Sequence, residues 1–196
     1  IRLLEDHEKK QWDEYVFSHT DATVYHLSGW RDVIEKAYGH DTYYLVAVSQ
    51  DKAKVIDRNS KIAGVLPLVH LKHFLFGNRL ISMPYADSGG VLADSAEIEK
   101  QLIEKGIEIL HRGSSSTLEL RHTKQLAQIS NSNGGFSVDV AFETDLRKTR
   151  MVLPLPDTSK KLFQSFKSKL RSQIRKPIKE GLYTTNGGMH LLDDFY

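Results

Sequence analysis

The sequence predicts a mixed α/β domain of the α+β kind, in which a largely antiparallel sheet is flanked by helices. Short segments rich in β-branched and aromatic residues follow one another along the chain, with polar turns between them. Segments with apolar residues three and four positions apart precede, interrupt and follow these strands. The chain has 196 residues, of which 40% are hydrophobic and 27% charged, as in ordinary globular proteins. Helices and strands in this irregular order are typical of an α+β fold.

Two helices are expected near the N-terminus. Residues 8–18 place their large apolar side chains on one face of a helix. Residues 29–38 have apolar residues at the same helical spacing. Ser28 is the expected N-cap of this second helix, and Gly39 falls at the C′ position, where a left-handed backbone is common.

Seven strands are expected from the runs of β-forming residues. The second of them contains Gly64 and Pro67, which predict a bulge or bend. A polar hairpin loop is expected over residues 51–59, after the first strand. The expected strands cover residues 42–49, 61–71, 79–84, 116–121, 136–142, 149–155 and 182–186.

A strongly amphipathic helix is expected over residues 95–111. Asp94 and Ser95 can cap its first turn, and Gly113 ends it. It follows a loop over residues 85–90 that joins a strand to this helix.

The longest expected helix covers residues 158–181. Its apolar residues recur every four positions, and Pro177 predicts a kink or restart because proline lacks the amide that would bond to residue 173. Asp193 or Asp194 is the expected cap of a further helix. Since a domain rarely ends where a helix starts, we expect the sequence to be a piece of a longer protein.

Charge is concentrated in residues 158–181. This segment has a net charge of +7, whereas the remainder has −5 and the whole chain only +2. A helix face of one sign repels itself unless an anion is near, so the pattern favours an anionic partner over a merely solvated face. Its basic residues are Lys160, Lys161, Lys167, Lys169, Arg171, Arg175, Lys176 and Lys179.

Several classes of protein are excluded. The absence of cysteine rules out a disulfide scaffold, a thiolate zinc site, a cysteine nucleophile and an iron–sulfur cluster. The longest apolar run, residues 62–69, is far shorter than the roughly 20 residues of a membrane-spanning helix. No Walker loop or G-x-G-x-x-G sequence occurs. His70 and His73 lack the spacing of metal ligands, so no metal site is expected.

Three segments occur together in one order. They are residues 64–90 (GVLPLVHLKHFLFGNRLISMPYADSGG), residues 118–121 (LELR) and residues 167–182 (KSKLRSQIRKPIKEGL), followed by LLDDFY at 191–196. In this order they resemble the N-terminal half of the FemAB-type family of GNAT-related acyltransferases. The resemblance is strongest to the group associated with exopolysaccharide and PEP-CTERM sorting systems. It implies a GNAT-like fold, in which residues 1–181 form the first half and residues 182–196 begin a truncated second half.

The resemblance also implies an activity. Such enzymes transfer an aminoacyl or acyl group to an amine of a peptidoglycan, other cell-envelope or exopolysaccharide precursor. The donor would be aminoacyl-tRNA or acyl-coenzyme A, with no tightly bound cofactor, and the acceptor a lipid-linked precursor at the membrane surface. The family's K-x-R-x-x-I-R-K stretch corresponds here to residues 169–176, and Pro177 stands where relatives tend to have alanine. A cytoplasmic protein, peripheral to the inner membrane, is implied.

Site residues follow from the chemistry of amide formation, which needs a proton acceptor and stabilisation of an oxyanion. Asp87 or Glu119 can accept the proton, and Arg121 or the amides of Gly89 and Gly90 can stabilise the negative charge. A surface ion pair and ordinary loop residues are the competing interpretation. The implied substrate contacts are the loop, with Tyr85, Gly89 and Gly90, and the basic residues Lys167, Lys169, Arg171, Arg175 and Lys176.

An alternative function comes from a different class of protein. A non-catalytic module can use the basic helix to bind RNA or another anionic partner. An ordinary acetyl-coenzyme A acetyltransferase is disfavoured, because no Q/R-x-x-G-x-G/A pyrophosphate loop is present.

Overall fold

The computed structural model describes residues 1–49, 61–73, 77–113, 115–124, 126, 141–149 and 151–195. The chain divides into two compact units, Ile1–Arg150 and Met151–Tyr196. The division falls ahead of the basic segment, which therefore belongs to the second unit. The predicted boundary after residue 181 grouped that segment with the first part of the chain.

The first unit is built on a six-stranded sheet. Its strands are β1 (Arg2–Leu3), β2 (Asp41–Val48), β3 (Ile62–His73), β4 (Gly77–Ile81), β5 (Leu92–Ala93) and β6 (Thr117–Glu119). They are ordered β1-β2-β3-β4-β6, with β5 paired to β3. The pair β4–β6 is parallel and the other pairs are antiparallel. This arrangement confirms the predicted mixed, largely antiparallel sheet of an α+β fold.

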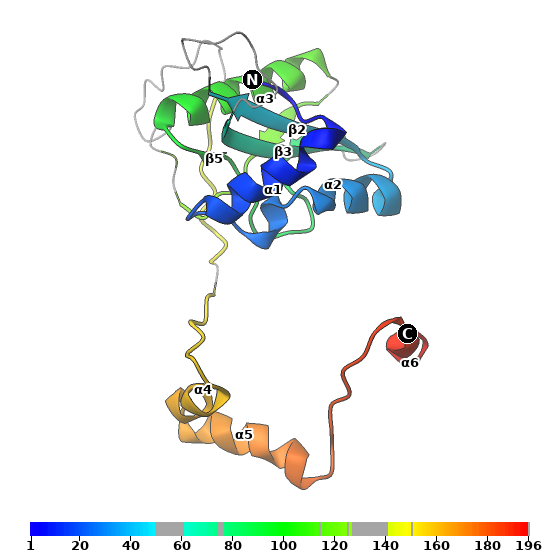
Figure 1. The fold of residues 1–196 in the computed structure, drawn as a ribbon, viewed down its shortest axis with the longest axis vertical. Coiled ribbons are helices and arrows are strands. Elements are labelled where there is room, and N and C mark those ends of the chain that lie inside the picture. The colour runs from blue at the N-terminus through cyan, green and yellow to red at the C-terminus, as the bar shows by residue number, and fades with distance from the viewer. Residues whose placement is uncertain are drawn as a thin grey trace. The chain divides into compact units, whose positions relative to one another are not determined.

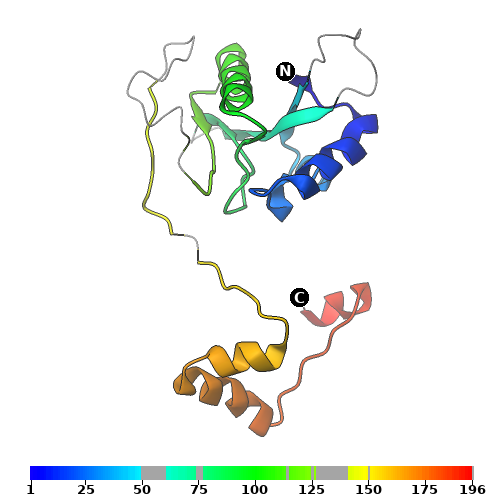
Figure 2. The ribbon, with the colours of Figure 1, turned by 60° about the vertical axis from the view of Figure 1, so that its left-hand side comes forward.

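Helices cover both faces of the sheet (Figures 1 and 2). The helices of this unit are α1 (Lys9–Ser18), α2 (Gly29–Val33) and α3 (Ala96–Arg112). Alternate residues of β2 point to opposite faces, as in any strand. Tyr44 and Val46 belong to the core cluster that contains Trp12 of α1, whereas Leu45 and Ala47 belong to the cluster beneath α3. Two hydrophobic layers therefore hold the sheet between helices.

The predicted helix over residues 29–38 is present, but not with the predicted cap. α2 continues into one π-helical turn, Ile34–Tyr38, and ends at Gly39 with a φ of 66°. Ser28 does not cap α2 through its side chain. Its hydroxyl and its amide instead donate to the carboxylate of Asp13, at 3.0 and 2.7 Å. Asp13 lies on α1, so only the packing of the two helices provides this acceptor.

The other predicted caps have different outcomes. Ser95 caps α3, because its hydroxyl oxygen accepts the amide hydrogen of Ile98 at 3.3 Å. Asp94 instead accepts a hydrogen bond from the hydroxyl of Tyr15 at 3.0 Å. Tyr15 comes from α1 on the opposite face, so Asp94 ties that helix to the end of β5.

The predicted bulge of β3 lies beside Gly64. Ala47 and Val48 of β2 pair with Gly64 and Ile62, so Ala63 is the extra residue on β3. Gly64 allows α3 to approach closely, since a Cβ there would lie 2.7 Å from Cγ2 of Ile98. In the described pairings, β3 contacts β5 before Pro67 and β4 after it. Proline thus occupies a stretch without a ladder partner on that edge, where its missing amide is tolerated.

Three predicted strands are not formed as expected. The predicted strand over 136–142 lies mostly outside the described residues, and residues 141–142 are not in a strand. Residues 151–155 and 182–186 are exposed and have no strand, so these two predictions are wrong. A run of β-forming residues becomes a strand only where a sheet edge is available for its backbone hydrogen bonds. The strand over 116–121 is confirmed in shorter form as β6.

The predicted long helix over 158–181 is two helices, α4 (Ser159–Ser165) and α5 (Ser168–Lys179). The break falls at Phe166, whose ψ of 148° is extended. Arg171 stabilises this break, because its guanidinium donates to the carbonyl oxygens of Phe166 at 2.8 Å and Gln164 at 3.2 Å. α5 continues through Pro177 to Lys179, so the helix does not restart there, and the kink at Pro177 stays a prediction.

The last helix, α6 (Leu192–Phe195), follows a 3-10 turn over Met189–Leu191. The predicted caps, Asp193 and Asp194, lie inside this helix, so it begins earlier than predicted. The apolar residues of α5 are not packed into a core within the second unit. Leu170, Ile174 and Ile178 are 41, 37 and 69% exposed.

Candidate functional site

Arg121 and the loop over residues 85–90 form one hydrogen-bonded structure. The carbonyl oxygen of Arg121 accepts the amide hydrogens of both Gly89 and Gly90, each at 3.0 Å. Its guanidinium donates to the carbonyl oxygen of Ala86 at 2.7 Å, and its own amide donates to the hydroxyl of Ser82 at 2.8 Å. The residues after β6 therefore hold the loop after β4 from both ends.

These bonds bear directly on the predicted roles. The amides of Gly89 and Gly90 already have an acceptor, so they must release Arg121 before they can stabilise an oxyanion. Glu119 is engaged at both oxygens, by Arg121 Nε at 2.8 Å and by Arg79 Nη2 at 2.9 Å. An incoming amine at Glu119 would have to displace an arginine. Asp87 is exposed in the loop.

Tyr85, the first residue of the loop, belongs to a small aromatic cluster with Tyr38 and His40. It has a φ of 66°, which is uncommon for a residue with a side chain. Its ring stacks on Tyr38 with the centroids 4.6 Å apart, and its hydroxyl lies 3.0 Å from Nε2 of His40. The ring is 61% exposed, so the cluster offers an aromatic surface to solvent.

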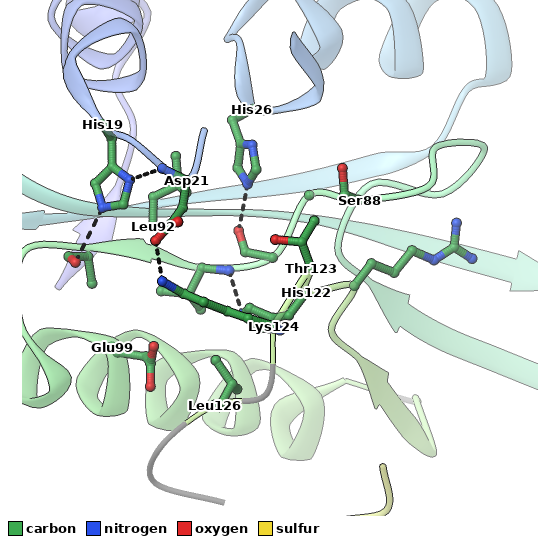
Figure 3. A pocket seen from close by; sticks show the side chains of 15 residues that line it. His19, Asp21, His26, Ser88, Leu92, Glu99, His122, Thr123, Lys124 and Leu126 are labelled. Atoms are coloured by element: carbon green, nitrogen blue, oxygen red, sulfur yellow. Dashed lines mark hydrogen bonds and ion pairs between the residues drawn. The ribbon is translucent and has the colours of Figure 1, made fainter. Parts of the chain in front are cut away.

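A pocket of about 80 Å³ lies beside the glycine pair (Figure 3). Of the predicted site residues, Gly89, Gly90 and Arg121 line it, whereas Tyr85, Asp87 and Glu119 do not. Its volume is a fraction of the roughly 300–1,000 Å³ of a pocket for a drug-sized ligand. The pocket therefore suits a small group at the end of a ligand rather than a whole nucleotide. Other lining residues that sequence analysis did not single out include His19, Asp21, His26, Glu99, His122 and Lys124.

His26 and His122 are the neutral histidines of the pocket wall. Nδ1 of His26 accepts the amide hydrogen of Thr23 at 3.1 Å, so Nε2 carries the proton and donates to the carbonyl oxygen of Gly90 at 3.2 Å. Burial lowers the pKa of His26. Nε2 of His122 accepts the amide hydrogen of Val91 at 2.9 Å, and burial lowers the pKa of His122 to about 4. Both imidazoles therefore serve as hydrogen-bonding parts of the wall.

Two carboxylates and one ammonium complete the polar lining. Lys124 and Asp21 form an ion pair. Glu99 lies in α3, and its Oε1 is buried without a hydrogen-bond partner among the described residues. Burial raises the pKa of Glu99, while the charge of Lys124 acts in the opposite direction. No sequence pattern points to Glu99, because acidic residues are common near helix N-termini.

The predicted basic residues lie on α5 and just before it. Within the described ranges, Lys167 and Lys169 have no carboxylate at ion-pair distance, whereas Lys176 lies 3.8 Å from Glu180. The guanidinium of Arg175 lies 4.9 Å from the ring centroid of Phe163. Phe163 is half-buried and takes part in this contact. The surface is therefore cationic and open to solvent.

The part of the chain that the structure describes contains no group of three or more histidine, aspartate or glutamate side chains placed to hold a metal ion. None of its helices is both long and apolar enough to cross a bilayer.

Fold and site together define an α+β domain that carries a small polar pocket where the loop after β4 meets the segment after β6. A scan against protein-family models finds no match to the chain, and a search of the curated proteins finds no significant match. The resemblance to the FemAB-type family therefore stays a prediction.

Proposed function

We propose that this chain is part of an N-acyltransferase of the FemAB type with a GNAT-like fold. It would transfer an aminoacyl or acyl group from an anionic donor to an amine of a cell-envelope or exopolysaccharide precursor. The observation that carries the proposal is the open cationic surface of α5, in a chain whose segment order resembles that family. The mixed sheet with helices on both faces is compatible with it.

The charge pattern of α5 supports an anionic donor. Lys167, Arg171 and Arg175 are four residues apart, so they follow one another along the helix at about one per turn. Guanidinium groups bind phosphate through paired hydrogen bonds, and lysines add positive point charges. The phosphates of aminoacyl-tRNA and of acyl-coenzyme A both meet this requirement.

The first unit would supply the loop that binds the acceptor. We propose that Arg121 is a positioning residue, because its donors and its carbonyl oxygen hold the loop containing Gly89 and Gly90. Asp87 is the exposed carboxylate of this loop and is the proton acceptor in the proposal. Glu119 is less suited to that role, because two arginines occupy its oxygens.

A second function is favoured by a separate observation. The basic helices belong to a compact unit distinct from the one that holds the pocket. A non-catalytic module that binds RNA or another polyanion through α5 needs nothing from the first unit.

The test uses the full-length protein and two donors, aminoacyl-tRNA and acyl-coenzyme A, titrated over a range of salt. Lys167→Gln/Lys169→Gln is the best variant, since neither lysine side chain forms a hydrogen bond or ion pair with the described residues, whereas Arg171 stabilises the α4–α5 break. We expect at least tenfold weaker donor binding, with a salt slope reduced by roughly 1 for each lost phosphate contact. Lys161→Gln, whose ammonium pairs with Asp157 at 2.9 Å, is the matched control.

Transfer to an amine acceptor separates the two functions. Donor binding with transfer supports the acyltransferase, and donor binding without transfer under any acceptor supports the binding module. If neither donor binds, or if Lys161→Gln weakens binding as much as the double variant, the role given to α5 is wrong.

A further inference from the structure

Two tyrosines, Tyr38 and Tyr85, stack on each other at the surface of the first unit. Their ring centroids lie 4.6 Å apart and their planes differ by 19°. The two residues are nevertheless 51 and 61% exposed, so the stacked pair leaves much of its aromatic surface to solvent. Single exposed apolar residues are ordinary on a protein, whereas a contiguous group of them is the kind of surface that binds a ligand.

Both rings are presented by irregular backbone. Tyr85 has a φ of 66°, which is a clear outlier for a bulky residue. Tyr38 is the last residue of the π-helical turn, and such turns are frequent at functional sites. Strained conformations persist only where the surrounding structure holds them, and they cluster where a protein binds or reacts. Two separate irregularities from distant parts of the chain thus meet in one stacked pair.

The loop that carries Tyr85 is anchored from beneath. Four of its six residues are buried, and the guanidinium of Arg121 donates to the carbonyl oxygen of Ala86 at 2.7 Å. Tyr85 and Asp87 are the two exposed residues of this loop. The carboxylate of Asp87 forms no hydrogen bond or ion pair with the described residues. The loop therefore presents an aromatic ring and a free hydrogen-bond acceptor two positions apart.

The orientation of the rings narrows the kind of ligand. The planes of Tyr38, Tyr85 and His40 differ by only 7, 18 and 19°. Organic cations are held in cages of aromatic faces, whereas parallel rings offer a flat surface. The hydroxyl of Tyr85 lies 3.0 Å from Nε2 of His40, which fixes the orientation of its ring. A flat ligand face is therefore the expected partner.

Charge narrows the ligand further. A carboxylate next to the rings repels a phosphate, so Asp87 disfavours a nucleotide. A pyranose sugar meets both requirements. The C–H groups on one face of a pyranose are attracted to the negative face of an aromatic ring. Its hydroxyl groups are donors, and an ionised carboxylate is a strong acceptor for them.

We propose that Tyr38 and Tyr85 form a platform for a neutral pyranose ring, which stacks its C–H face on the exposed aromatic surface and donates a hydroxyl hydrogen to the carboxylate of Asp87. Binding needs no acyl donor and no reaction. The platform and the acyl transfer proposed above are therefore tested separately, and either can fail without the other.

The test is a titration of the full-length protein with four methyl β-D-pyranosides, those of glucose, galactose, mannose and N-acetylglucosamine. Binding is followed by NMR at the backbone amides of Tyr38, Tyr85 and Asp87. We expect at least one sugar to give saturable shifts with a Kd of about 1 mM, as is usual for so small a ligand. Saturation transfer from the protein should be strongest at the C–H protons of one face of the sugar.

Three variants examine the platform. Tyr85→Asn removes the ring and suits the left-handed backbone, and it should weaken binding at least about tenfold, the usual effect of losing a stacking partner. Tyr38→Leu leaves the loop unchanged and should weaken binding several-fold, as should Asp87→Asn. The matched control is Tyr183→Asn, because Tyr183 is 89% exposed and has no ring partner among the described residues. Its Kd should equal that of the wild type.

Four outcomes would overturn the proposal. The first is that none of the four sugars binds saturably. The second is that Tyr38→Leu and Tyr85→Asn both keep the wild-type Kd. The third is that Tyr183→Asn weakens binding as much as Tyr85→Asn. The fourth is that choline or adenosine monophosphate binds at this surface more tightly than every sugar, which would show a cation site or a nucleotide site instead.

Discussion

The imidazole of His122 lies directly against Cα of Gly90, so residue 90 has no room for a side chain. A Cβ at this position would lie 2.6 Å from both Cδ2 and Nε2 of the ring. The ring is held in place because Nε2 accepts the amide hydrogen of Val91. The amide of Gly90 is in turn held by the carbonyl oxygen of Arg121. This contact fixes the loop after β4 to the segment after β6.

Gly90→Ala is expected to destabilise the protein by about 1–3 kcal/mol, the usual effect of overpacking a close contact. Neither the ring nor the loop can yield without losing a hydrogen bond. Gly29→Ala is the matched control, because nothing lies within 4 Å of the Cβ it would add. Urea denaturation of both variants checks the prediction, and equal stability of the two would contradict it.

The two arginines on Glu119 should differ in their importance. Arg121→Met removes charged hydrogen bonds to Ala86 and Glu119 and should cost about 1.5–3 kcal/mol. Arg79→Met removes an ion pair whose arginine is 47% exposed, and should cost about 0–1 kcal/mol. Thermal unfolding of the two variants, made side by side, measures the difference. A larger loss at Arg79 would show that Arg121 does not hold the loop.

Acid should destabilise the fold through His122. Its pKa lies at about 4 in the folded protein, against an ordinary value of 6.5. Between these values the unfolded chain binds a proton that the folded protein does not, so the free energy of unfolding falls as the pH is lowered. The full effect of this one group is about 3 kcal/mol. His122→Gln can still accept the amide hydrogen of Val91 but has no imidazole to protonate. Its unfolding should therefore take up about one proton fewer across this range, and its free energy of unfolding should depend less steeply on pH. An unchanged slope in urea titrations from pH 7 to 4 would refute the assignment.

Glu99 should show the opposite dependence on pH. Its pKa is raised in the folded protein, so the unfolded chain releases this proton at lower pH. The free energy of unfolding should therefore fall as the pH rises through this interval, to a lower value at neutral pH. Glu99→Gln should be the more stable form at pH 7, by up to about 1 kcal/mol, because solvent screens part of the charge. The gap should close below the ordinary glutamate pKa of 4.5, and a constant gap in pH-dependent unfolding would contradict the prediction.

Local patterns predicted most elements of the first unit but not their pairing. The periodicity over residues 95–111 placed α3 and its cap Ser95, since a helix satisfies its own backbone. Strands depend on a neighbour, which explains why residues 151–155 and 182–186 have β-forming composition without forming strands. The break at Phe166 depends on Arg171, five residues later, and no helical pattern shows that contact.

The site was predicted in part. Gly89, Gly90 and Arg121 were singled out, and the structure brings them together through hydrogen bonds. The bonds also occupy the groups that were expected to meet a substrate. Glu99 and His122 were missed, because burial and the absence of a partner are properties of the folded chain.

The sequence by itself determined the α+β class, the main helices and the concentration of positive charge in residues 158–181. These depend on composition and on spacings of a few residues, which local geometry translates directly into structure. The tertiary structure alone decided that β4 and β6 pair in parallel, that Arg121 anchors the glycine loop, and that one oxygen of Glu99 is left without a partner. Each of these joins residues tens of positions apart, and only packing of the folded chain sets which polar groups meet and which are closed off from water.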